Sequence, residues 1–209
     1  MKITIIGAGN MGRGIGARAV AGGHEVEIVD RNPEDARGLA DELGGGATAV
    51  DAGGQIGGEV VVLAVYYASI AEAVDQYRER LAGKVVVEIS VPLDWETMDR
   101  FVVPANSSAG EETQKLLPED TPVVKAFCTT FARTLVTGEK NGTPLDVPMA
   151  GDDEGAKQKV ASIVEGGGMR PIDIGPLRRA RLLEHAAFLQ ISAQEPLGSG
   201  FASALKFLT

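Results

Sequence analysis

The sequence predicts an α/β fold built on a doubly wound parallel sheet, and two observations support this prediction. Apolar runs of strand length alternate with segments of helical periodicity, and the connections between them are short. The run 60–65 is continuously hydrophobic, and 84–90 is nearly so, which is typical of parallel strands that are buried on both faces. We therefore expect helices to cover both faces of the sheet.

Strands and helices alternate over the first part of the chain. The first strand ends in a glycine-rich turn, and the second alternates charged and β-branched residues, as a half-exposed strand does. Pro33 opens a helix at the position where proline is best tolerated, and Ser69 opens another whose apolar residues share one face. The predicted strands are 2–6, 25–30, 60–65 and 84–90, and the predicted helices are 13–23, 33–43 and 69–81.

The second part of the chain has a weaker pattern. Between Pro92 and Pro122, a capping box at Ser108–Glu111 opens a short helix that ends near Leu117. No internal repeat or long linker interrupts the chain, so we expect one compact unit. The remaining predicted strands are 123–127, 147–151 and 170–174, and the remaining predicted helices are 157–165 and 178–190.

Composition limits the classes of partner. A net charge of −9 would repel nucleic acid phosphates, and a hydrophobic fraction of 44% is that of a globular protein. No apolar run reaches the roughly 18 residues of a spanning helix, and the first strand begins without a secretory signal. Cys128 is the single cysteine, which excludes an internal disulfide. We expect a cytoplasmic protein that binds neither nucleic acid nor a membrane.

The segment Gly7–Gly12 carries the spacing G-x-G-x-x-G between the first strand and the first helix. Gly7 permits a tight turn, Gly9 lets the backbone approach a pyrophosphate, and Gly12 lets the helix and strand pack closely. The start of the helix adds free N–H groups and the positive end of the helix dipole. A glycine-rich turn without a ligand has the same spacing, but this position favours a dinucleotide site on a Rossmann-type fold.

The end of the second strand carries conflicting signals for the choice of dinucleotide. Asp30 lies where an acidic residue typically accepts hydrogen bonds from the adenosine ribose, which favours NAD. Arg31 follows it and could pair with a 2′-phosphate, which favours NADP, or could stack on the adenine or point to solvent. The choice between NADP and NAD stays open at this point.

Few residues can act as acids, bases or metal ligands. His24 precedes the second strand, at the end of the sheet away from bound ligands. His185 lies within the last helix and could reach the cleft, but packing or exposure is expected. Asp152 and Asp153 directly precede a helix, which favours helix capping over metal binding. We expect no metal site.

Cys128 and Thr130 follow the strand 123–127, at the sheet edge where substrates bind in such folds. Both are weak acids at neutral pH, and no base that would activate Cys128 is identifiable, so a packed cysteine is expected. Trp95 and the pair Tyr66–Tyr67 could line a pocket for a planar ligand or pack in the core. These residues suit hydride transfer between two rings held face to face, which depends on positioning.

Four segments share their order and spacing with a known family: Gly7–Gly14, Val123–Thr129, Asp146–Asp153 and Arg170–Leu183. They resemble the NADP oxidoreductases that depend on the deazaflavin coenzyme factor 420. The resemblance implies a Rossmann domain over 1–145 and a small C-terminal α/β domain over 146–209 that closes a cleft for both coenzymes. It also implies direct hydride transfer between nicotinamide and deazaflavin, and a homodimer.

The resemblance also implies roles for particular residues. Cys128 and Thr130 would lie beside the reacting rings. The residues implied to bind the nucleotide, in addition to Asp30 and Arg31, are Gly7, Gly9, Asn10, Met11, Gly12, Val65, Tyr66, Ser90, Val91 and Pro92. The chain departs from the usual family pattern at Ala8, Asp30, Asn32 and Cys128, which replace a threonine, a serine, a basic residue and an asparagine or histidine.

The leading hypothesis is an NAD(P)-dependent oxidoreductase that passes hydride to or from a deazaflavin. A second enzyme hypothesis is a reductase of a small imine or carbonyl compound, but only about 60 residues follow Gly151 to build its substrate pocket. A third hypothesis is a dinucleotide sensor that binds its ligand without turning it over.

Overall fold

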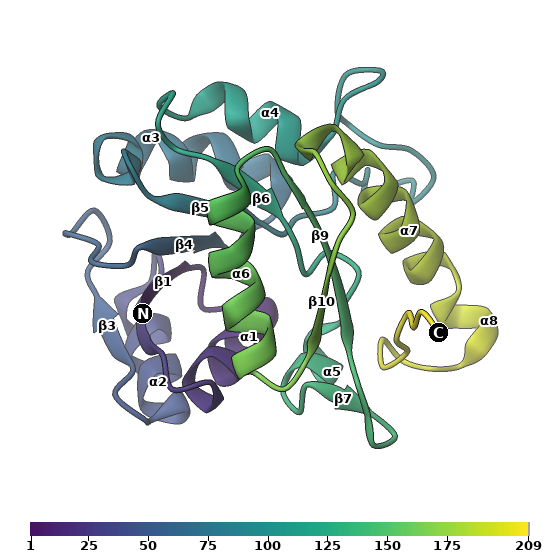
Figure 1. The fold of residues 1–209 in the computed structure, drawn as a ribbon, viewed down its shortest axis with the longest axis horizontal. Helices are drawn as coiled ribbons and strands as arrows, with labels where there is room; N and C mark the ends of the chain where they lie inside the picture. The colour runs from purple at the N-terminus through teal and green to yellow at the C-terminus, as the bar shows by residue number, and fades with distance from the viewer. Residues whose placement is uncertain (209) are drawn as a thin grey trace.

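A computed structural model describes residues 1–208 and confirms the α/β class (Figure 1). The strands of the main sheet are β1 (Lys2–Ile6), β2 (Glu25–Val29), β3 (Thr48–Val50), β4 (Val60–Leu63), β5 (Val85–Glu88), β6 (Val123–Lys125), β9 (Asp146–Gly151) and β10 (Arg170–Asp173). Their order across the sheet is β10-β9-β6-β5-β4-β1-β2-β3. Neighbouring strands are parallel, except that β6 and β9 pair antiparallel. The chain therefore winds outward from β1 in both directions, as the sequence predicts.

Helices cover both faces of the sheet because successive residues of a buried strand point to opposite sides. Val60 and Val62 belong to one hydrophobic cluster, and Val61 and Leu63 belong to the other. The first cluster packs against α1 (Asn10–Ala21), α2 (Pro33–Leu43) and α6 (Glu154–Gly166), and the second packs against α3 (Ile70–Leu81). The other helices are α4 (Ala109–Leu116), α5 (Ala132–Leu135), α7 (Ala180–Ser192) and α8 (Gln194–Leu197), with 3₁₀ turns at Tyr67–Ser69 and Leu177–Arg179.

Two features of the sheet could not be predicted from hydrophobic periodicity: the edge strand β3 and the place of β9 and β10 in the sheet. The short edge strand β3 contains exposed residues and carries no apolar pattern, so no strand was predicted there. At the other edge, β9 and β10 extend the main sheet, and the hairpin β7 (Glu139–Lys140) and β8 (Thr143–Pro144) connects them to the preceding part of the chain. Residues from 146 onward thus begin as two strands of the same sheet.

The C-terminal region projects past that edge. In Figure 1, α7 and α8 lie beside β9 and β10, and the irregular segment after α8 turns back toward the sheet. No helix within residues 1–208 is both long enough and apolar enough to span a bilayer. The carboxyl ends of β1, β2, β4, β5 and β6 share one edge, because these strands are parallel, and that edge holds the site described next.

Candidate functional site

The glycine loop has the close contacts that a dinucleotide loop requires. A Cβ added to Gly12 would lie 2.0 Å from the carbonyl oxygen of Gly7, and one added to Gly7 would lie 2.4 Å from that of Ala64. Gly7 also has a φ of +116°, which other residues rarely adopt. A Cβ on Gly9, in contrast, would meet no protein atom within 4 Å. No protein atom therefore requires a glycine at this position, and the missing side chain leaves room for a ligand outside the loop.

The amino end of α1 is open to an anion. Gly9 is the N-cap residue and offers no side-chain oxygen to the first N–H groups of the helix. Unpaired N–H groups and the helix dipole make such an end a site for phosphate. The loop and the helix start therefore have the free N–H groups and the open space on which the predicted pyrophosphate site depends.

A cavity of about 280 Å³ extends from the loop toward the end of β2. Asp30 and Arg31 line it, together with Gly7, Gly9, Val65 and Tyr66. Both carboxylate oxygens of Asp30 accept backbone hydrogen bonds, one from the N–H of Ala8 at 2.8 Å and one from the N–H of Asn32 at 3.0 Å. Asp30 thus ties the glycine loop to β2, and Arg31 is exposed at the cavity wall.

A second cavity of about 310 Å³ adjoins the first and shares four lining residues with it: Gly9, Ala64, Val65 and Tyr66. Predicted site residues dominate its wall. These are Gly9, Asn10, Met11, Val65, Tyr66, Ser90, Val91, Cys128 and Thr130. Gly12 and Pro92 line neither cavity; both are buried. The structure therefore brings the loop, the ends of β4 and β5, and the segment after β6 to one cavity.

The segment after β6 contains a tight turn at Phe127. This buried residue has a φ of +61°, which costs a non-glycine residue about 1–3 kcal/mol. The N–H of Cys128 donates to the carbonyl of Ala126 at 2.8 Å, and the hydroxyl of Thr130 donates to that of Phe127 at 2.7 Å. The turn directs Cys128 and Thr130 into the cavity wall, and strain of this kind is concentrated at functional sites.

The thiol of Cys128 is not a nucleophile at neutral pH. Burial raises its pKa to about 12, although the Lys125 ammonium acts in the opposite direction. A thiol with such a pKa stays protonated between pH 6 and 9, and Cys128 lines the cavity as a packed side chain. This agrees with the packed cysteine expected from the sequence.

Two pairs of aromatic residues line the second cavity, which we call the central cavity. Tyr66 and Trp95 are 70% and 48% exposed and meet edge to face, with their ring centroids 6.0 Å apart. Phe131 and Phe201 also line it and pack edge to face at 5.3 Å. The sequence indicated the first pair but not the second, because Phe201 lies in the irregular segment after α8.

That C-terminal segment is held in place by a buried carboxylate. The side chain of Asp146 is fully buried and accepts two hydrogen bonds from Arg170, one from Lys206 and one from the N–H of Phe207. Although burial alone would raise the pKa of Asp146, these donors hold it well below its usual range. The clamp keeps the segment that carries Phe201 against the cavity.

The histidines and the paired aspartates lie outside both cavities. The ring of His185 packs edge to face on Phe101 at 4.8 Å, and burial lowers the pKa of His24. Asp153 caps α6 by accepting the N–H of Ala156 at 2.7 Å, as predicted, whereas Asp152 accepts the N–H of Leu177 at 2.9 Å and does not cap α6. Within residues 1–208, no three His, Cys, Asp or Glu side chains converge as a metal site would require.

Comparison with known proteins relates the chain to one family. Residues 2–92 match the family described as NADP oxidoreductase, coenzyme F420-dependent. The F420-dependent NADP reductase of Methanocaldococcus jannaschii is 30% identical over 200 residues, which cover 88% of each chain. A crystal structure from Arthrobacter sp. FB24, provisionally described as an F420-dependent NADP reductase, superposes with a TM-score of 0.86 and 28% identity over the whole of both chains.

A segment of a longer protein is also similar to this chain. The metalloreductase STEAP3 of Rattus norvegicus is 32% identical over 186 residues, which are 88% of this chain. The match covers 36% of the length of the rat protein, so it concerns a part of that protein only.

Proposed function

The chain belongs to the family of coenzyme F420-dependent NADP oxidoreductases, and on that premise we propose that it passes hydride directly between NADP and a deazaflavin. One observation carries the proposal: the glycine loop borders two adjoining cavities, one that extends to Arg31 and one that is lined mainly by apolar and aromatic side chains. The first has the chemistry to hold the adenosine end of a dinucleotide. The second has room for two stacked rings at the nicotinamide end.

Asp30 at the end of β2 would by itself favour NAD, but its contacts and the position of Arg31 in the first cavity favour NADP. Asp30 already accepts two backbone hydrogen bonds, and its replacement would free the loop from β2. We propose that it acts as a latch for the loop and that Arg31 receives the 2′-phosphate, because an exposed guanidinium at the cavity wall matches a phosphate in charge and geometry.

The second cavity needs no acid or base for this reaction. Reduced deazaflavin gives a hydride to NADP and releases one proton, so the products are oxidised deazaflavin, NADPH and a proton that passes to solvent. The protein must hold the rings face to face and exclude water, which apolar walls do well. We propose that Cys128 and Thr130 border the reacting rings and that Tyr66 and Trp95 flank the deazaflavin.

An assay of four combinations tests the function. Reduced deazaflavin is mixed with NADP or NAD, each with the enzyme and without it, and the return of the absorbance of the oxidised deazaflavin is followed. We expect enzyme-dependent turnover that is faster with NADP. Binding of NADPH with no turnover of either nucleotide would exclude the deazaflavin as hydride partner.

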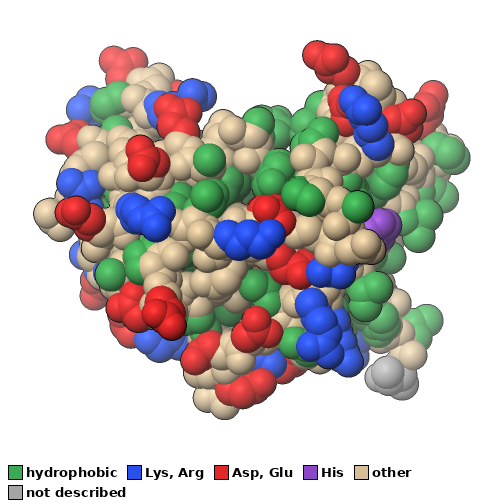
Figure 2. Space-filling view, turned by 90° about the horizontal axis from the view of Figure 1, so that it is seen from above, with side chains coloured by type: hydrophobic (Ala, Val, Ile, Leu, Met, Phe, Trp, Pro, Cys, Tyr) green, Lys and Arg blue, Asp and Glu red, His purple; other side chains and the backbone are tan. Residues whose placement is uncertain are grey.

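We propose in addition that two copies of the chain associate through α7. Leu182 and Leu189, two turns apart on this helix, are 64% and 69% exposed, and Leu197 in α8 is 65% exposed. In Figure 2, apolar side chains gather along the right-hand margin beside the histidine side chain, with charged groups above and below them. Light scattering should give twice the mass of the chain, and Leu182→Lys with Leu189→Lys should give the mass of a monomer.

A further inference from the structure

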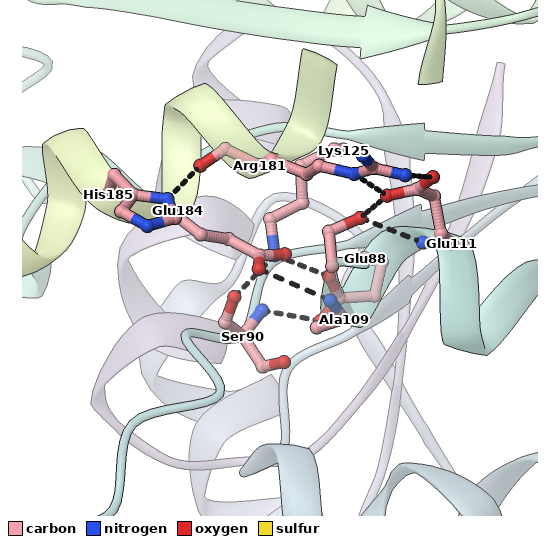
Figure 3. A network of polar contacts seen from close by, with 9 residues as sticks. Glu88, Ser90, Ala109, Glu111, Lys125, Arg181, Glu184 and His185 are labelled. Atoms are coloured by element: carbon pink, nitrogen blue, oxygen red, sulfur yellow. Dashed lines mark hydrogen bonds and ion pairs between the residues drawn. The ribbon is translucent and has the colours of Figure 1, made fainter. Parts of the chain in front are cut away.

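Three charged side chains are buried together, and Figure 3 shows them beside Ser90. They are Glu88 at the end of β5, Lys125 at the end of β6 and Glu184 in α7, and each is at most 1% exposed. The ammonium of Lys125 lies 2.5 Å from a carboxylate oxygen of Glu88 and 2.8 Å from one of Glu184. We call these three residues the ion triad.

The ion triad is not explained by stability. Removing charges from water costs free energy, and well-packed apolar side chains of similar volume often stabilise a fold as well as a buried ion pair does. Although burial alone would lower the pKa of Lys125, the two carboxylates raise it, so the ammonium stays charged. Burial raises the pKa of Glu184. Because burying these charges costs free energy, we look for a function of the ion triad that apolar side chains could not perform.

The ion triad holds the backbone of Ser90 from both sides. Glu88 accepts the N–H of Ser90 at 2.7 Å, and Lys125 donates to the carbonyl oxygen of Ser90. Glu184 in turn accepts the N–H of Ala109 at the start of α4, at 3.2 Å. The position of Ser90 therefore depends on groups from β5, β6 and α7.

Ser90 lines the central cavity, and its hydroxyl is a polar atom without a partner. The residue is 6% exposed, and its Oγ is buried with no hydrogen bond to any described residue. A buried hydroxyl without a partner is unfavourable, and a carbonyl oxygen of an entering ligand would satisfy it. Both proposed substrates carry such an oxygen, on the carboxamide of the nicotinamide or on the pyrimidine ring of the deazaflavin.

We infer that the ion triad is a positioning group that fixes Ser90 so that its hydroxyl donates a hydrogen bond to a ring carbonyl in the cavity. This inference rests on the proposed function for the identity of the two rings. The hydroxyl of Ser90 contacts the ligand, and Glu88, Lys125 and Glu184 act through it.

A double-mutant cycle between Ser90→Ala and Glu88→Gln tests the inference. We measure the Kd of NADPH and of oxidised deazaflavin by fluorescence, and the melting temperature of each variant. Each single replacement should raise one of the two Kd values about tenfold, and the double variant should show little more than the larger single effect, because both changes remove the same contact. A purely structural role of Glu88 would give effects that multiply to about a hundredfold.

The control variant is Glu111→Gln. Glu111 also joins α4 to α7, through two hydrogen bonds to Arg181 of 2.6 and 2.7 Å, but it does not contact Ser90. Its effect on the two Kd values should be small and should combine independently with that of Ser90→Ala. Glu184→Gln repeats the cycle if Glu88→Gln does not fold. Loss of folding with both replacements would overturn the inference, because the ion triad would then serve stability.

The two ligands separate the possible results. If the effects of the two replacements on the Kd of NADPH are coupled, Ser90 contacts the carboxamide of the nicotinamide. If their effects on the Kd of the deazaflavin are coupled, Ser90 contacts the pyrimidine ring. Multiplicative effects on both overturn the inference. If deazaflavin neither binds nor turns over, the proposed function fails, and the NADPH cycle still decides whether the ion triad positions Ser90.

Discussion

Replacing Gly9 with alanine should weaken nucleotide binding without destabilising the fold. Gly9 has a φ of −73°, which alanine adopts readily, and an added Cβ would meet no protein atom within 4 Å. Its only new neighbour would be a ligand at the amino end of α1. The same change at Gly12 would place a Cβ 2.0 Å from the carbonyl oxygen of Gly7 and force the loop to move.

The contacts give the expected magnitudes. A methyl group at Gly9 would displace the pyrophosphate and remove one charge-assisted hydrogen bond or two, at about 1.5–3 kcal/mol each. One lost bond corresponds to a rise of about 10- to 150-fold in the Kd of NADPH. The free energy of unfolding should stay equal or rise by up to about 1 kcal/mol, because alanine restricts the unfolded chain. Gly12→Ala should instead lower it by at least about 1–3 kcal/mol.

Fluorescence titration with NADPH and thermal unfolding separate these effects. Gly9→Ala should show the raised Kd with an unchanged or slightly raised melting temperature, and Gly12→Ala should show a lowered melting temperature. Wild-type affinity in a folded Gly9→Ala variant would refute the placement of the pyrophosphate at this loop.

Three further predictions concern single side chains. Arg31→Ala should raise the KM for NADP about 10- to 100-fold and leave that for NAD nearly unchanged, because one charge-assisted contact to the 2′-phosphate is lost; equal effects on both nucleotides would contradict this role. Cys128→Ala should keep kcat within about threefold, and the wild-type pH–rate profile should show no thiol ionisation below pH 10, since the pKa of Cys128 is raised to about 12. The lowered pKa of Asp146 should contribute stability fully above its ordinary pKa of about 3.9, with progressive loss as the pH falls below that value. Asp146→Asn should lower the free energy of unfolding at pH 7 by about 1.5–3 kcal/mol, the value for a lost hydrogen bond to a charged group, and should flatten this acid dependence in urea titrations.

The nucleotide side of the site could be predicted from local sequence. The glycine spacing, the preceding strand and the following helix each depend on a few adjacent residues, and parallel strands then place Val65 and Ser90 at the same edge. The roles of these residues in binding stay predictions until ligands are measured.

The other side of the cavity depends on contacts between distant segments. Phe201 lies in a segment without periodicity, and this segment is held by distant residues: Arg133 donates to the carbonyl oxygen of Gly200, and Asp146 accepts from Lys206 and Phe207. The ion triad combines residues 88, 125 and 184, which are far apart in the sequence. The sequence alone does not distinguish a lysine such as Lys125 that forms buried ion pairs from one that contacts a ligand. The pairing of β9 with β6 was likewise not encoded in either strand alone.

The most direct test of the central claim is an isotope experiment. Deazaflavin reduced with deuterium at the position that donates hydride is incubated with the enzyme and NADP, and the NADPH formed is analysed by mass spectrometry. Direct transfer between rings held face to face predicts one deuterium in each NADPH. NADPH without deuterium, or no NADPH at all while the nucleotide binds, would contradict the account.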